Sequence, residues 1–436
     1  MQKISFKEAF LFWLKLGFIS FGGPAGQIAI MHEYLVEKKK WISESRFLHA
    51  LNYCMLLPGP EAQQLATYTG WLMHGTLGGV IAGLLFILPS IIIMLALSVL
   101  YVQYHNLQLV TAIFDGIKPA VAAIIFVALL KIGEKALKRP VDFAIAAFAL
   151  AAIYFVHVPY PLVIFAALAA GLVHAYIFKT DDEETIVKGD DDESSYYINN
   201  KSAIDTSISI KRVIKLLLVF AVLWMIPLGV LFLLQKNFGF WQKLITFFSG
   251  AAVVTFGGAY SVLTYVSQEA VNHLRWLSMP EMMDGLAMGE STPGPLIMVL
   301  TFVGFMGSYR NMGFSVGWGA VGLLVTTFYT FLPSFAFILF GAPIVEATQE
   351  NKSIKKALSF VTAAVVGVIA NLFLFIVMAL YRGSCNEEPN MRIRFAQLVW
   401  LVISVIAIKK FNVNMVLWLV ISALAGLGLF LLPFVK

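Results

Sequence analysis

Phe21-Gly22-Gly23 recurs as Phe256-Gly257-Gly258, and Pro58-Gly59-Pro60 recurs as Pro293-Gly294-Pro295. Each second copy lies 235 residues after the first (256 minus 21 and 293 minus 58). Glycine and proline interrupt helices, yet the chain around these motifs is strongly apolar. Irregular backbone at membrane depth survives only where protein buries it or where it lines a cavity. These two repeated motifs, called the doublet below, are therefore the first place to look for a transport site.

The composition around the doublet is that of a membrane protein. The chain has 436 residues, of which 59% are hydrophobic and 13% charged, whereas a soluble domain carries about 25% charged residues. A helix crosses a bilayer with roughly 20 apolar residues. Longer runs without Asp, Glu, Lys or Arg occupy Thr76–Tyr104, Gly313–Val345, Ala357–Tyr381 and Asn412–Val435. These runs predict an all-α polytopic membrane protein. We therefore expect the lipid bilayer to be its partner.

The charged and sulfur-containing residues exclude several other classes. The net charge of +6 comes from basic residues scattered between the apolar runs, which fits cytoplasmic loops and does not favour a nucleic-acid surface. Cys54 and Cys385 alone make neither a disulfide framework nor a metal site. We expect no metal, no cofactor and no enzymatic activity, because no nucleophile–base pair occurs at a recognisable spacing. The sequence leaves open whether the protein forms a homodimer.

The chain divides into two copies and two connecting pieces. We expect an N-terminal transporter repeat at 1–178, a disordered acidic cytoplasmic linker at 179–212, a connecting transmembrane helix at 213–234 and a C-terminal repeat at 235–436. Pro89-Ser90 matches Pro333-Ser334 at a spacing of 244 (333 minus 89), so the second copy gains nine residues after its Pro-Gly-Pro motif. We place these residues in a loop around Ser308–Met312.

One extra crossing between the copies predicts that the second copy is inverted. A basic cluster that begins at Lys131 follows one long span of the first copy, whereas a cluster that begins at Lys352 precedes the equivalent span of the second. Both clusters lie in the cytoplasm only if the copies have opposite orientations. Inverted repeats with broken helices near the midplane are typical of secondary transporters.

The breaks themselves have the chemistry of an anion site. Proline suits the first turn of a new helix, and a helix start offers free N–H groups and a positive dipole end. Two such starts per copy could hold one anion at the midplane. The alternative is that each break is an ordinary kink. As substrate-binding residues we expect Gly22, Gly23, Pro24, Gln27, Pro58, Gly59, Pro60, Glu61, Gln64, Gly257, Gly258, Thr292, Pro293, Gly294 and Pro295.

Five charged residues are candidates for coupling or gating. Lys40 and Arg275 each precede a tryptophan, which fits an interfacial helix end or an anion-attracting vestibule. Asp115 and Lys118 lie three residues apart inside a span, so they either form a structural ion pair or serve coupling. Glu290, like Glu61, lies beside a break. Either could carry a proton or cap a helix, and for Glu61 we expect capping.

The order of these motifs resembles a known family. FGGPAGQIAIMHEYLVEKKKW followed by LPGP, and VTFGGAYSVLTYVSQEAVNHLRW followed by TPGP, are similar to the long, two-domain form of the chromate ion transporter family. The resemblance covers nearly the whole chain. It implies a bacterial inner-membrane protein that exports chromate, with sulfate exchange proposed. The family's motif residues carry over as Phe21, Gly22, Gly23, Pro24, Pro58, Gly59, Pro60, Phe256, Gly257, Gly258, Pro293, Gly294 and Pro295.

We therefore expect a secondary transporter of oxyanions that exports chromate and confers chromate resistance. Sulfate or another small anion is the alternative cargo, and a membrane scaffold is the alternative class. A scaffold function would not explain why four helix breaks occur at equivalent positions of the two copies. Because Pro24 becomes Ala259 and Glu61 becomes Leu296, we expect the first copy to bind the anion more strongly.

Overall fold

The computed structural model describes residues 4–21, 23–177, 195–198, 210–234, 237–256, 258–347, 352–382 and 391–431. Helices dominate these residues, and no β-strand forms among them apart from one isolated bridge. The prediction of an all-α fold is confirmed. Gly22, Gly257 and most of the expected linker lie outside the described residues.

The helices of the first copy are α1 Phe6–Ile19, α2 Gly23–His32, η1 Glu33–Lys38, α3 Glu44–Leu56, α4 Glu61–Tyr104, α5 Gln108–Ala136, α6 Pro140–Tyr154 and α7 Tyr160–Ile177. α8, Ile210–Leu234, connects the copies. The second copy has α9 Phe238–Val253, α10 Ala259–Gln268, η3 Glu269–His273, α11 Met279–Ser291, η4 Leu296–Met298, α12 Val299–Asn311, α13 Val316–Ala347, α14 Lys352–Arg382, α15 Met391–Lys410 and α16 Met415–Leu431.

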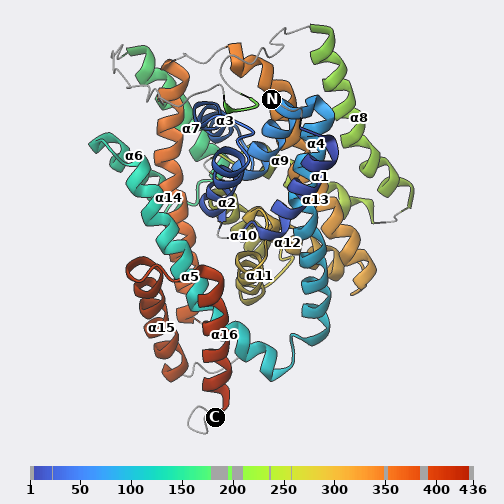
Figure 1. The fold of residues 1–436 in the computed structure, drawn as a ribbon. Coiled ribbons are helices and arrows are strands. Elements are labelled where there is room, and N and C mark those ends of the chain that lie inside the picture. Colours follow the sequence, from blue (N-terminus) through green and yellow to red (C-terminus); the bar gives the residue numbers. More distant parts are fainter. Residues whose placement is uncertain are drawn as a thin grey trace.

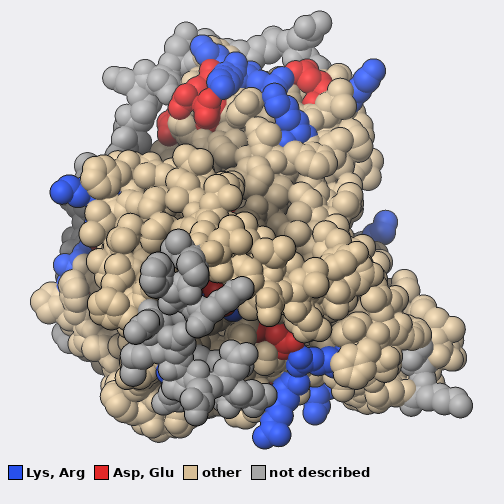
Figure 2. Space-filling model, turned by 90° about the horizontal axis from the view of Figure 1, so that it is seen from below, with Lys and Arg blue, Asp and Glu red and all other residues tan. Residues whose placement is uncertain are grey.

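Six described helices are long and apolar enough to cross a membrane, and they belong to α4, α5, α7, α8, α13 and α14. The surface agrees with this reading. α8 runs along the outside of the molecule (Figure 1) and exposes large apolar side chains such as Leu218 and Leu233. In Figure 2, charged side chains gather at one edge of the face and in a patch toward the opposite side, with a broad uncharged region between them. Large exposed apolar side chains on these helices fit contact with lipid.

Secondary structure repeats with the sequence. A π-helix follows α2 as η1 and follows α10 as η3. Lys40 and Arg275, which are 235 residues apart, both adopt a positive φ, of 51° and 52°. The next helix begins after Ser43 in one copy and after Ser278 in the other, and each serine side chain caps it. The same local sequence pattern therefore produces the same backbone twice.

The last two helices of each copy pack on the other copy. The pair α6 and α7 packs on α14 of the second copy, and the pair α15 and α16 packs on α5 of the first; Figure 1 shows α15 and α16 beside α5. Small residues permit the contact, since a Cβ added to Gly116 would lie 2.2 Å from the Ser422 carbonyl oxygen. Close backbone approach of this kind drives helix association in lipid.

The helix at the first Pro-Gly-Pro motif continues without a loop into the next span. α4 has 44 residues and is interrupted only at His74 and Gly75, where the backbone leaves helical angles. In the second copy, α12 ends at Asn311 and α13 begins at Val316. The loop expected around Ser308–Met312 therefore lies slightly later, because α12 runs on to Asn311.

Two further expectations differ from the structure. Trp41 is buried against Phe12, with ring centroids 4.9 Å apart, so it fills the core instead of marking an interface. Four residues of the expected disordered linker, 195–198, are described and pair with the chain before α3: the Ile198 N–H donates to the Trp41 carbonyl at 3.0 Å. The apolar Ile198 side chain, itself buried, explains this attachment.

Candidate functional site

The two Pro-Gly-Pro motifs are tied reciprocally to the two Phe-Gly-Gly motifs. The Gly59 N–H donates to the carbonyl of Thr255, 2.8 Å away, in the second copy. The Gly294 N–H donates to the carbonyl of Ser20, 2.7 Å away, in the first copy. Ser20 and Thr255 are equivalent, since each directly precedes its Phe-Gly-Gly motif. Each copy therefore completes the broken backbone of the other.

Serines of the long spans pack against the same two glycines. The Ser90 hydroxyl donates to the Pro293 carbonyl at 2.5 Å, and the equivalent Ser334 donates to Gln63 Oε1 at 2.6 Å. A Cβ on Gly294 would lie 1.8 Å from Ser90 Oγ, and a Cβ on Gly59 would lie 3.1 Å from Ser334 Oγ. Both glycines also have positive φ, 134° at Gly59 and 94° at Gly294. A side chain at either position would therefore meet both a steric clash and a strained backbone.

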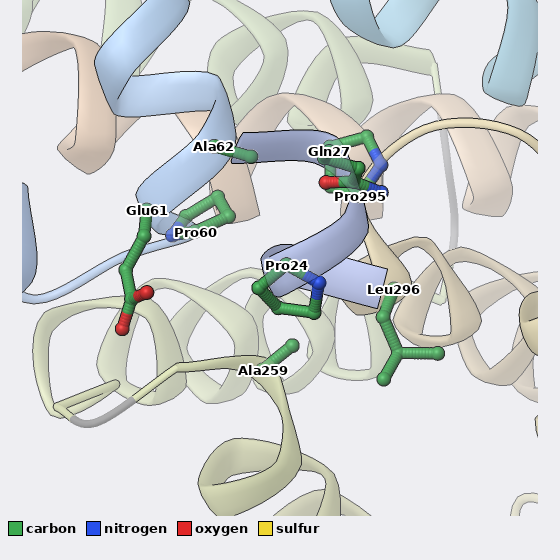
Figure 3. Close-up of a pocket in the computed structure, with 8 residues that line it drawn as sticks. All are labelled: Pro24, Gln27, Pro60, Glu61, Ala62, Ala259, Pro295 and Leu296. Atoms are coloured by element: carbon green, nitrogen blue, oxygen red, sulfur yellow. The ribbon is translucent and has the colours of Figure 1, made fainter. Parts of the chain in front are cut away.

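Four helix starts meet at one small pocket, drawn in Figure 3. Its walls are Pro24 of α2, Pro60, Glu61 and Ala62 at the start of α4, Ala259 of α10, and Pro295 and Leu296 before α12; Gln27 of α2 also lines it. These residues occupy the first turns of their helices or the cap positions before them. Free N–H groups and positive dipole ends from both copies therefore converge on one point.

The structure brings five of the expected binding residues to the pocket itself: Pro24, Gln27, Pro60, Glu61 and Pro295. Gly23, Pro58, Gly59, Gly258, Thr292, Pro293 and Gly294 form the adjoining backbone, and Gln64 braces it by donating from Nε2 to the Pro58 carbonyl at 2.8 Å. The space is little larger than a water molecule. The described conformation is thus closed, and a tetrahedral oxyanion enters only if the surrounding helices separate.

Side chains make the two halves of the pocket unequal. Gln27 is buried, and its Nε2 donates to the Gly294 carbonyl at 2.5 Å, while its Oε1 has no hydrogen-bond partner within the described part of the chain. The equivalent residue of the second copy is Val262. Glu61 and Gln64 of the first copy likewise correspond to Leu296 and Val299. The first copy supplies the polar side chains, and both copies supply backbone.

Glu61 does not cap a helix, in contrast to our expectation. Pro60 is the N-cap of α4, and no side chain bonds there. The Glu61 side chain extends toward the loop before Ala259 (Figure 3), and its Oε1 lies 3.4 Å from the position of a Cβ on Gly258. Pro60 holds the residue at the first position of α4, where the side chain points away from its own helix start.

Glu290 lies behind the pocket and also caps no helix end. It is buried near the end of α11, and its Oε1 accepts a hydrogen bond from the Tyr260 hydroxyl at 3.1 Å. Tyr260 in turn lies in the first turn of α10. A buried carboxyl therefore stands one side chain away from a helix start that lines the pocket.

Asp115 and Lys118 pair on one helix face, and a third charge joins them. Lys118 Nζ lies 2.9 Å from Asp115 Oδ1 and 3.3 Å from Asp284 Oδ1 of α11. The Tyr101 hydroxyl donates to Asp284 Oδ2 at 2.8 Å. This Lys118 cluster (Tyr101, Asp115, Lys118, Asp284) links both copies through α11, the helix that leads into the second Pro-Gly-Pro motif.

Lys40 and Arg275 do not line the pocket. Both side chains are exposed at the positive-φ turns described above. Lys40 Nζ lies 6.0 Å from the ring centre of Tyr196. The structure keeps these cations at the surface, away from the helix starts.

Sequence reasoning missed Ser90, Ser334, Tyr260 and Asp284 as members of the site. Ser90 and Ser334 were visible as a repeated Pro-Ser pair, and Asp284 is an acidic residue within an apolar segment. Both signals mark special positions in membrane helices. Neither signal names the distant partner, which only the fold supplies.

Comparisons with known proteins point to one family. The family model described as chromate transporter matches residues 7–172 and again 242–427. A chromate transport protein of Pseudomonas aeruginosa is 33% identical over 369 residues, covering 84% of this chain and 80% of the relative. A probable chromate transport protein of Synechococcus elongatus is 27% identical, covering 91% and 89%. An uncharacterised transporter of Methanocaldococcus jannaschii is 27% identical, covering 83% and 81%. No solved structure matches the chain.

Proposed function

The chain belongs to the chromate transporter family, and we propose that it is a secondary transporter that exports chromate across the bacterial inner membrane. The observation that carries this proposal is the convergence of four helix starts from two copies on one pocket. Backbone N–H groups and dipole ends bind anions without a metal or a cofactor. Relatives with this name support chromate as the cargo.

Inverted orientation of the copies is part of the proposal, and the packing supports it. Arg139, which follows α5, donates from Nη2 to Ser359 Oγ, 3.2 Å away, near the start of α14. The end of α5 thus meets the beginning of the equivalent helix α14. The reciprocal bonds of Gly59 and Gly294 are the pattern that a two-fold axis produces. On this basis the basic clusters after α5 and before α14 lie together on the cytoplasmic side, with the central linker.

Alternating access around the pocket would then be a movement of one copy against the other. We assign the Lys118 cluster to the closure of one route, because it clamps α11 to α5. The other side lacks an equivalent: His49 stands where Asp284 would be, and Thr362 stands where Lys118 would be. The two routes are therefore closed by different chemistry.

The membrane potential favours export of an anion over its uptake. Moving one charge through 100 mV is worth about 2.3 kcal/mol, so a dianion that leaves an inside-negative cell gains roughly twice that. Export needs no other energy source, and it would confer resistance to chromate. Sulfate has the same shape and charge as chromate, so helix starts alone do not distinguish the two anions. Exchange of sulfate for chromate is compatible with the same pocket.

The test is flux in reconstituted vesicles. Purified protein is placed in liposomes with labelled chromate inside, and efflux is followed at a fixed membrane potential with sulfate present or absent outside. We expect saturable efflux that accelerates when the outside is positive. Acceleration by external sulfate would support exchange. Absence of saturable flux of either anion would contradict the proposal and favour a scaffold.

A further inference from the structure

The pocket contains a buried acceptor atom to which a fully deprotonated oxyanion offers no donor. Gln27 Oε1 is buried in the wall and has no hydrogen-bond partner among the described residues, while the amide nitrogen donates to the Gly294 carbonyl. Chromate and sulfate dianions carry only acceptors. A buried acceptor without a donor is costly, and a dianion brings further acceptors and negative charge into the same space.

Glu61 is the titratable side chain at this place. Among the described residues that line the pocket it is the one that ionises, and it forms no hydrogen bond or ion pair with the described chain. Its carboxylate lies beside the start of α10, where the dipole favours a negative charge. When it is ionised and the pocket is empty, Glu61 therefore provides the negative charge that the helix starts attract.

An arriving oxyanion meets this carboxylate as a like charge in a partly buried space. The repulsion disappears when Glu61 takes up a proton, and the resulting O–H becomes a donor. The surrounding titratable groups do not replace this step. Glu61 acts on the Cys54 thiol of α3 through its charge, Lys135 of α5 acts on Glu61 in the same way, and the Glu290 carboxyl is bonded to Tyr260.

Resting on the proposed function, we propose that the pocket binds its oxyanion together with one proton, which is held by Glu61. The transported unit is then a dianion plus a proton, with a net charge of minus one, so the membrane potential drives its export with one charge instead of the two of the bare dianion. Transport alternates between two forms of the site, one with ionised Glu61 and no anion and one with protonated Glu61 and an anion. The proton is a second substrate of the same pocket.

The zero-flux potential of chromate in proteoliposomes tests this. Alkaline buffers on both sides keep chromate as the dianion, and potassium gradients with valinomycin set the voltage. A tenfold chromate gradient is balanced by about 59 mV if the net charge is one and by about 30 mV if the dianion moves alone. A tenfold proton gradient adds a shift of about 59 mV in the first case and none in the second.

Variants locate the proton. Glu61→Gln removes the titration and keeps a donor, so in the flux that it supports we expect the proton shift to vanish and the balance point to fall to the dianion value. Glu134→Gln, an exposed change on α5, should retain the wild-type shift. A shift that survives in Glu61→Gln, or that vanishes in Glu290→Gln instead, would overturn the assignment to Glu61. If Glu61→Gln does not fold, Glu61→Asp should retain the shift.

The wild-type measurement separates this inference from the proposed function. Chromate flux with a balance point that ignores the proton gradient would overturn the inference and leave chromate transport standing. Absence of any flux would overturn the proposed function itself. The same vesicles therefore distinguish a failure of the proton inference, in which flux remains, from a failure of the proposed function, in which flux is absent.

Discussion

The first and second copies of the broken segment have the same backbone but different side chains. Both begin a helix after Phe-Gly-Gly, both continue into a π-helix, and both turn at a basic residue with nearly equal φ. Yet Gln27 and Glu61 correspond to Val262 and Leu296 of the other copy. The repeated sequence thus places the same helix starts in both copies, whereas the side chains at the pocket differ.

The glycines test the shared backbone, and we expect the largest effect there. Gly59→Val and Gly294→Val should each reduce chromate flux about 100-fold or more, because the new side chain strains a positive φ and collides with Gln64 at Gly59 and with Ser90 at Gly294. Gly313→Ala is the matched control, since Gly313 has φ 70° but open space around it. Flux in vesicles is measured beside the unfolding midpoint. If only one of the two glycines mattered, the copies would not contribute equal backbone.

The Lys118 cluster tests the part that is not duplicated. Lys118→Met leaves Asp284 buried against Tyr101 without its cation, and removal of one partner of a buried pair costs about 3–5 kcal/mol. We expect a lower thermal midpoint in detergent and a partial recovery in Lys118→Met combined with Asp284→Asn. Thr362→Val, at the equivalent position of α14, should change little. Equal destabilisation by both changes would argue against an asymmetric closure.

Gln27 tests the difference inside the pocket. Gln27→Val copies the second half into the first and leaves the Gly294 carbonyl without its donor, which costs about 1–3 kcal/mol. We expect chromate affinity to fall roughly tenfold, as seen in the concentration that gives half-maximal flux. Gln103→Ala, an exposed glutamine of α4, serves as the control. Unchanged affinity would mean that the first copy is not the stronger binder.

The serines should give the smallest effects and should give them equally. Ser90→Ala and Ser334→Ala each remove one hydroxyl hydrogen bond across the copies, worth about 1 kcal/mol of stability. Both midpoints are expected to fall by a similar amount with flux largely retained. A much larger effect of one serine would show that the difference between their acceptors, the Pro293 carbonyl and Gln63 Oε1, decides the contribution of each bond.

Local pattern predicted most of the fold and part of the site. The helix breaks at Pro58 and Pro293 were predictable, because glycine and proline act on their immediate neighbours. The contact between Lys118 and Asp284 was not, because the two residues are far apart in the chain and nothing near either one names the other. The burial of Trp41 escaped for a related reason: a tryptophan beside lysines fits a membrane interface equally well until its neighbours are known.

The exchange of helix pairs has a consequence for how the protein is made. A ribosome completes α5 long before α15 and α16, the helices that later cover it, and before Asp284. During that interval α5 must sit in lipid with two charges, each costing about 2.5–3.5 kcal/mol at the centre of a lone helix. The Asp115–Lys118 pair, one turn apart at 2.9 Å, neutralises them within a single helix. The pair thus allows α5 to enter the bilayer while its permanent neighbours are still untranslated.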